Sequence, residues 1–155
     1  ALQMKIFGKV RTLEDEVDIV TEVLKIAGCA IFLDIWFYGT HKILHWPRVY
    51  KSIHRIHHRF NAPVAVASMY AHPLEFQFGN VLGVILGPVV INCHPLTSCL
   101  WWCLCVISAG GSHSGYIFLD ATHHDKHHKY FKYNFGISVL CMDKLCNTEF
   151  IVREN

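Results

Sequence analysis

The clearest shortage in this 155-residue sequence is charge, because Asp, Glu, Lys and Arg together make up only 17% of it, against roughly 25% in typical soluble domains. No lysine or arginine occurs from Phe60 through Asp125, and Glu75 is the only charged residue before Asp120 in that stretch. This central deficit favours a membrane setting. The formal net charge of +2, without a basic run that includes aromatic residues, gives no indication of nucleic-acid binding.

Two motif classes are also missing. The seven cysteines form no paired C-x-x-C frame, which excludes the usual zinc-ribbon spacing. Their odd number, and their position mostly inside apolar runs, argue against a disulfide scaffold and favour reduced thiols. No G-x-G-x-x-G fingerprint of a nicotinamide or flavin site occurs. Electrons for any redox reaction must therefore come from outside the chain.

The apolar pattern from Ile19 to His45 contains no proline and predicts one helix of about 40 Å, long enough to cross a membrane. Its charged residues Glu22, Lys25 and Asp34 indicate that one face packs against protein. Pro47 ends this helix. A second, amphipathic helix rich in Lys and Arg is expected from Pro47 to Arg59.

Two further apolar runs, Val81–Cys93 and Cys99–Ala109, flank the turn-forming stretch His94–Ser98. They predict a helical hairpin that enters a bilayer and returns, with His94 structural and with Trp101 and Trp102 as interfacial anchors. The alternative is a pair of buried helices in a soluble protein.

Basic residues surround the two histidine-rich segments on either side of the hairpin, so the positive-inside tendency places both segments on the cytoplasmic face. The predicted fold is an all-α integral membrane helical bundle with a cytosolic, histidine-rich, metal-binding cap. Residues 1–18 are expected to form a polar lead-in, residues 19–147 the membrane metal-binding domain, and residues 148–155 a tail.

All twelve histidines fall between positions 41 and 128. Most belong to one H-x-x-x-H pair and two H-x-x-H-H motifs, whose spacings place imidazoles on one face of a helix. These are His41 and His45; His54, His57 and His58; and His124, His127 and His128. One pair alone arises by chance on surface helices, but three motifs within one short region predict metal binding.

The number of these histidines indicates two metal ions, because eight imidazoles exceed the four ligands of a closed tetrahedral zinc site. Neutral imidazole suits iron, copper, zinc or nickel and excludes calcium or magnesium. Asp34 lies on the same helical stripe as His41, either to accept a hydrogen bond from a metal ligand or as an ordinary buried polar residue. His72 and Glu75 are expected to orient ligands or shape a tunnel, with helix capping as the alternative.

The run HKILHWPRVYKSIHRIHHRFNAPVAVASMYAHPLE, followed by HSGY and HHDKHH, resembles the fatty acid hydroxylase superfamily of membrane di-iron enzymes. The stretches APVAVASMYAHPLE and HSGY are most similar to the C-4 methylsterol monooxygenase branch and its fatty acid hydroxylase domain-containing relatives. The resemblance extends from about Phe32 to about Asn147. It implies a multi-pass protein of the endoplasmic reticulum membrane, with its histidine boxes facing the cytosol.

The resemblance also implies an activity: O2-dependent oxidation of a sterol C-4 methyl group or a related lipid C–H bond by two iron ions. Electrons would come from NAD(P)H through a reductase and cytochrome b5. A basic face formed by Arg48, Lys51, Arg55, Lys126 and Lys129 is a candidate docking site for an acidic carrier, with lipid headgroup contact as the alternative.

Carried over residue by residue, the implied ligands are those of the three motifs together with His113 of HSGY. Ile117 stands where several relatives have another histidine, and the link from Tyr116 to His123 is short. One ion is therefore expected to lack a ligand unless His72, His123 or water fills the place.

Three alternatives remain open from the sequence. One is a non-catalytic, metal-binding membrane paralogue, and another is a fatty acid or sphingolipid hydroxylase or a sterol desaturase. The third is a zinc or nickel transporter or sensor, for which ligands at mid-bilayer depth are expected.

Overall fold

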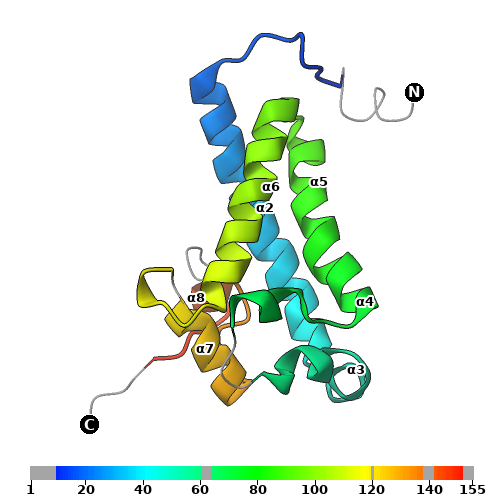
Figure 1. Ribbon diagram of the computed structural model, residues 1–155, viewed down its shortest axis with the longest axis vertical. Coiled ribbons are helices and arrows are strands. Elements are labelled where there is room, and N and C mark those ends of the chain that lie inside the picture. The colour runs from blue at the N-terminus through cyan, green and yellow to red at the C-terminus, as the bar shows by residue number, and fades with distance from the viewer. Residues whose placement is uncertain (1–9, 61–63, 120, 138–141, 152–155) are drawn as a thin grey trace.

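The computed structural model describes residues 10–60, 64–119, 121–137 and 142–151. Residues 1–9 of the expected lead-in, Cys141 and residues 152–155 of the expected tail lie outside these ranges. Within them all regular secondary structure is helical, so the predicted all-α class is confirmed. Three long helical segments stand side by side, and the short helices gather at one of their ends (Figure 1).

The predicted first helix is present as α2 (Ile19–Leu44). Asp18 caps its N-terminus, where a carboxylate oxygen accepts a hydrogen bond from the Thr21 amide at 3.0 Å. The helix ends just before Pro47, as the restriction on residues that precede proline requires. Glu22 is buried and accepts hydrogen bonds from Lys25 and from the His94 amide, which confirms that one face of α2 packs against protein.

The predicted hairpin is also present. Its first arm comprises α4 (Pro73–Glu75), the π-helical turn η3 (Phe76–Val81) and α5 (Leu82–Ile91), and thus starts earlier than predicted. Asn92, with φ 54°, ends this arm. The second arm is α6 (Pro95–Ser112), where the His94 ring accepts a hydrogen bond from the Leu96 amide.

Both arms, Pro73–Ile91 and Pro95–Ser112, are long and apolar enough to cross a membrane. Only 28% and 17% of their most apolar windows are buried, whereas core helices of a soluble domain would be mostly buried. The 18 residues of α6 span roughly 27 Å at 1.5 Å per residue, close to the thickness of a hydrocarbon core. These properties favour the membrane hairpin over the soluble alternative.

Trp101 is not the expected interfacial anchor. It is 6% exposed, and its indole N–H donates to the Val84 carbonyl oxygen at 3.1 Å. The ring belongs to a core cluster with Cys93 and with Cys29 and Leu33 of α2, so it packs inside the bundle. Trp102 is 48% exposed and remains compatible with an anchoring position. Of the six described cysteines, which form no disulfide with one another, Cys29 and Cys93 are buried, whereas Cys99, Cys103 and Cys146 are exposed.

The helix expected from Pro47 to Arg59 is a further correction. The α-helix α3 (Pro47–Ser52) stops at Ile53, whose φ of −121° and ψ of −70° lie outside the helical region, and a 3-10 helix η1 (His54–Arg59) follows. A 3-10 helix has three residues per turn, so residues three apart lie above each other. The rings of His54 and His57 accordingly stack with their centroids 5.5 Å apart.

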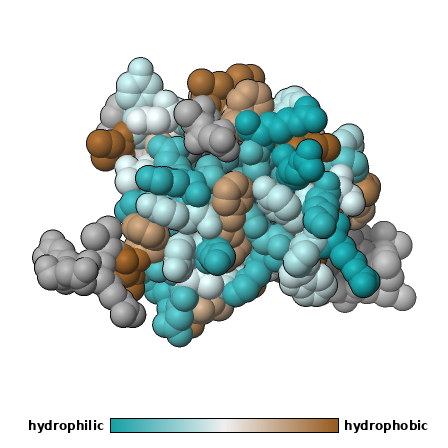
Figure 2. Space-filling model, turned by 90° about the horizontal axis from the view of Figure 1, so that it is seen from below, coloured by the Kyte–Doolittle hydropathy of each residue, from teal (hydrophilic) through white to brown (hydrophobic). Residues whose placement is uncertain are grey.

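The remaining short elements form the cap: η2 (Ala65–Met69), η4 (Ile117–Leu119), α7 (Ala121–Tyr130) and α8 (Met142–Leu145). Its outer face is largely hydrophilic (Figure 2). The described start of the tail belongs to this cap, because the Phe150 ring stacks on Tyr130 with ring centroids 4.8 Å apart. The fold therefore separates an apolar helical end from a polar cap.

Candidate metal centre

Nine histidines of the cap lie in two groups, within each of which the possible ligand atoms are all within 4.8 Å of one another. The first group has five members, from α2, η1 and α7. They are His41, His45, His54, His58 and His127. The second group has four members, from η1, the end of α6, and α7. They are His57, His113, His124 and His128. Together they are the nine histidines that the sequence nominated as ligands.

Two pairs of sequence neighbours connect the groups. His57 and His58 point into different groups, as do His127 and His128. The groups are therefore adjacent, and the ring centroids of His58 and His128 lie only 4.5 Å apart. Consecutive residues of a helix point about 100–120° apart, which separates the two imidazoles of each pair in the 3-10 helix η1 and in the α-helix α7 alike.

Six of the nine outward-facing ring nitrogens are held by acceptors, whereas the buried Nδ1 of His58 has no partner among the described residues. Five Nδ1 atoms lie 2.7–3.3 Å from backbone carbonyl oxygens. The pairs are His41 with Phe135, His57 with Tyr70, His113 with Ala109, His127 with Tyr133, and His128 with Phe60. A carbonyl oxygen can only accept, so each of these Nδ1 atoms carries the ring proton. In neutral imidazole the inward-facing Nε2 is then a bare lone pair.

These lone pairs face one another. Eight Nε2 to Nε2 contacts of 3.0–3.4 Å connect members of the same group. Two of these contacts, His57 with His113 and His57 with His128, join rings whose Nδ1 atoms both donate to carbonyl oxygens, so neither Nε2 bears a proton and neither contact is a hydrogen bond. Burial also lowers the pKa of His54 to about 3, of His57 to about 4 and of His128 to about 2, so the rings are neutral at pH 7. A cation at the centre of each group satisfies converging lone pairs of this kind, and imidazole nitrogen is a ligand for iron, copper, nickel and zinc.

The Nδ1 atom of His54 is held by a side chain, that of Glu75. His54 Nδ1 lies 2.7 Å from Glu75 Oε1, and both side chains are buried. A carboxylate that accepts from a metal-binding histidine fixes its tautomer and ring orientation. The expectation that Glu75 orients a ligand is therefore met in the geometry.

The other three residues nominated as extra ligands or partners lie outside both groups. Asp34 is 1% exposed and accepts from the backbone amides of Ile137 and Met142, not from His41. His72 accepts from the Leu74 amide and so caps α4, which is the alternative considered above. His123 lies 3.8 Å from Asp143.

Ile117 is 82% exposed on η4, away from the groups. The four imidazoles of the second group converge without a contribution from this position. A histidine at 117 is therefore not needed to bring four nitrogen donors together in this chain.

The structural role of Asp143 was not identified from the sequence. Asp143 is 5% exposed and accepts from the amides of Phe135 and Gly136 at 2.8 and 2.7 Å. It thereby fixes the segment whose Phe135 carbonyl orients His41. Gly136 is required here, because a Cβ would lie 2.9 Å from Asp34 Oδ1. No spacing rule connects an aspartate to the backbone amides that it binds, so the sequence carried no signal for this role.

Comparison with known proteins identifies the family. The profile of the fatty acid hydroxylase family matches residues 26–148. Fatty acid hydroxylase domain-containing protein 2 of Homo sapiens is 36% identical over 135 residues, covering 85% of this chain and 40% of that protein. Methylsterol monooxygenase erg25B of Aspergillus fumigatus is 36% identical over 145 residues, covering 84% and 49%.

Fatty acid hydroxylase ahd1 of Mycosarcoma maydis is 40% identical over 111 residues, covering 70% of this chain and 29% of that protein. The chain thus spans less than half the length of each of these curated relatives. No solved structure matches it. The family match covers most of the chain and includes all nine histidines of the two groups, and it confirms the resemblance drawn from the motifs: the chain belongs to the fatty acid hydroxylase family.

Proposed function

We propose that this chain is the metal-binding domain of a membrane-bound di-iron oxygenase that oxidises a C–H bond of a sterol, at its C-4 methyl group, or of a related lipid. The observation that carries the proposal is the convergence of neutral Nε2 lone pairs in two adjacent groups of five and four histidines. Each group would hold one iron. A transporter would instead place ligands at mid-bilayer depth, whereas these histidines lie in the polar cap.

The class of reaction follows from the chemistry of the substrate. An unactivated lipid C–H bond offers neither an acidic proton nor an electrophile, so side-chain acids and bases cannot cleave it. A redox cofactor is required. Two iron ions, when bound, would supply the activation of O2. The chain's own residues orient the neutral imidazoles through backbone carbonyls and Glu75, and they keep the site buried.

The setting of the reaction is part of the proposal. The hairpin arms would cross the endoplasmic reticulum membrane, with the cap on the cytosolic side, so that lipid reaches the site from the bilayer. Electrons would come from NAD(P)H through a reductase and cytochrome b5. Arg48, Lys51, Arg55 and Lys129 are exposed on the cap, and Lys126 is half-buried over the Phe150 ring. This basic face is suited to an acidic carrier.

Metal analysis of the purified chain, combined with lipid profiling of cells with and without it, tests the proposal. We expect about two irons per chain, as two groups of imidazoles imply, and an O2- and reductant-dependent change in 4-methylsterols or another lipid class. A His58→Ala variant should lose iron and the lipid change together. A single zinc per chain would contradict the di-iron proposal. Iron without any lipid change would identify a non-catalytic paralogue.

A further inference from the structure

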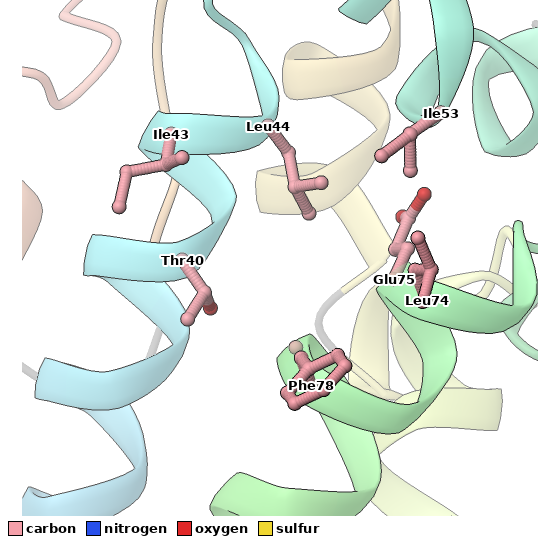
Figure 3. Close-up of a pocket in the computed structure, with 8 residues that line it drawn as sticks. Thr40, Ile43, Leu44, Ile53, Leu74, Glu75 and Phe78 are labelled. Atoms are coloured by element: carbon pink, nitrogen blue, oxygen red, sulfur yellow. The ribbon is translucent and has the colours of Figure 1, made fainter. Parts of the chain in front are cut away.

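A cavity of about 210 Å³ lies between α2 and the first hairpin arm, close to the metal centre. Figure 3 shows Thr40, Ile43 and Leu44 on the α2 side, with Leu74, Glu75 and Phe78 opposite and Ile53 at one end. Three of the lining residues, Thr40, Leu44 and Ile53, directly precede His41, His45 and His54 in the chain. The cavity therefore borders the first group of histidines.

The walls of this cavity offer almost no polar surface. Apart from Thr40 and Glu75 the lining side chains are aliphatic or aromatic, with Gly79 completing the wall. The Thr40 hydroxyl donates to the Trp36 carbonyl oxygen of its own helix at 2.9 Å. Glu75 is consequently the one lining side chain with a polar atom that has no hydrogen-bond partner among the described residues.

Glu75 has one oxygen in use and one without a partner. Its Oε1 accepts from His54, whereas its buried Oε2 has no hydrogen-bond partner among the described residues. The residue is only 6% exposed, and its carboxyl group points toward Ile53 at the end of the cavity (Figure 3). A buried carboxylate oxygen without a donor is unfavourable, so this atom calls for a ligand that supplies one.

We propose that this cavity binds the hydroxyl end of a lipid alcohol, whose hydroxyl group donates a hydrogen bond to Glu75 Oε2. The inference rests on the proposed function, since it names the substrate class of the same site. One wall belongs to the candidate membrane span Pro73–Ile91, so an apolar molecule can reach the cavity from the bilayer. A pure hydrocarbon would leave Oε2 without a donor, and no cationic side chain lines the cavity to receive a phosphate headgroup.

Photolabelling of the full chain in membranes tests this inference without turnover. The probes are a diazirine-bearing sterol with a free hydroxyl group, its O-methyl ether, and a diazirine-bearing long-chain alcohol. We expect adducts of at least one alcohol within Thr40–Leu44 or Leu74–Phe78, and about tenfold less labelling by the ether, because it lacks the donor for the Oε2 acceptor. Whether the sterol or the long-chain alcohol labels more strongly identifies the source of the hydroxyl group.

Two glycines provide a matched pair of variants. A Cβ on Gly79 would lie 3.9 Å from Leu44 Cδ1, an ordinary contact, so Gly79→Leu should fill the cavity and reduce labelling about tenfold, as loss of the buried apolar contact implies. A Cβ on Gly39 meets nothing within 4 Å and the residue does not line the cavity, so Gly39→Leu should leave labelling unchanged.

The variant Glu75→Gln distinguishes recognition of the lipid hydroxyl group from apolar packing in the cavity. The amide keeps an oxygen for His54 and places an NH2 donor toward the cavity, so alcohol and ether should then label equally. Equal labelling of the wild-type chain by alcohol and ether, or adducts only outside the cavity, would overturn the inference. Labelling needs neither O2 nor reductant, so failure of the oxygenase proposal would leave this result interpretable.

Discussion

The hairpin is stabilised by different forces from those that stabilise the histidine cap. The hairpin consists of two apolar helices that satisfy their own backbone groups and pack against each other, as Trp101 does against Val84, and against α2, as Gly87 does against Cys29. The cap consists of short helices whose centre is a set of facing nitrogen lone pairs. Apolar packing needs no ligand, whereas facing lone pairs repel until a cation lies between them. The two regions should therefore respond very differently to metal.

Metal removal should produce the largest difference between the cap and the hairpin. Chelation should raise amide hydrogen exchange in α7 and η1 by at least about 100-fold, because binding of the ion is coupled to the folding of the groups that hold it. Exchange in α5 and α6 should change little. Hydrogen exchange read by mass spectrometry, with the metal restored as a control, measures both regions at once. Equal exchange in the cap before and after chelation would show that the cap is stable without metal.

Acidification should have the second-largest effect, which is a loss of stability in the cap. Burial lowers the pKa of His54, His57 and His128 to about 3, 4 and 2, below the value of about 6.5 in an unfolded chain. The unfolded cap therefore binds more protons than the folded cap between about pH 6.5 and pH 4, and its stability falls as the pH is lowered through this window. The loss is on the order of 1 kcal/mol per histidine per pH unit.

Exchange measured at pH 7.5 and at pH 5 checks this expectation. The described part of α6 contains no Asp, Glu, Lys, Arg or His and serves as the internal reference. Faster exchange in α6 than in α7 on acidification, after correction for intrinsic rates, would contradict the assignment of the acid-sensitive groups to the cap.

The same division explains what the sequence could predict. The long helix and the hairpin follow from local features, namely proline-free apolar runs and the turn at His94–Ser98. The nine histidines followed from motif spacing and from the family resemblance. These signals depend only on residues that are close together in the sequence, so no tertiary information was needed to detect them.

The cap's supporting contacts could not be predicted in this way. The partners of His41 and His127 are backbone carbonyls of Phe135 and Tyr133, and a carbonyl is present at every residue, so it leaves no mark in the sequence. Asp34 was placed beside His41 by helical periodicity, yet its oxygens bind amides more than 100 residues later. The end of α3 at Ile53 and the 3-10 form of HRIHH likewise left no signal in the residue spacing, from which one continuous helix was expected.

Asp143→Asn should have an intermediate effect that remains confined to the cap. One amide oxygen cannot replace two carboxylate oxygens that accept from Phe135 and Gly136, so we expect a loss of about 1–3 kcal/mol. Iron affinity should fall about 10- to 100-fold, because the Phe135 carbonyl orients His41. Trp101→Phe is the matched control, since it removes one buried hydrogen bond from the hairpin and should leave iron affinity unchanged. If Trp101→Phe lowered the iron affinity more than Asp143→Asn, the assignment of metal binding to the cap and not to the hairpin would be contradicted.

Ile117→His should have the smallest effect, although the sequence singles out this position. The side chain is 82% exposed on η4, and a surface substitution of this kind usually changes stability by less than about 0.5 kcal/mol. Four histidines already converge in the second group, so the new imidazole should change neither the iron content nor the thermal stability. Metal analysis of the variant beside the wild-type chain decides the matter. A gain in bound iron would mean that η4 turns inward when metal binds, and that the second group lacks one ligand in this chain.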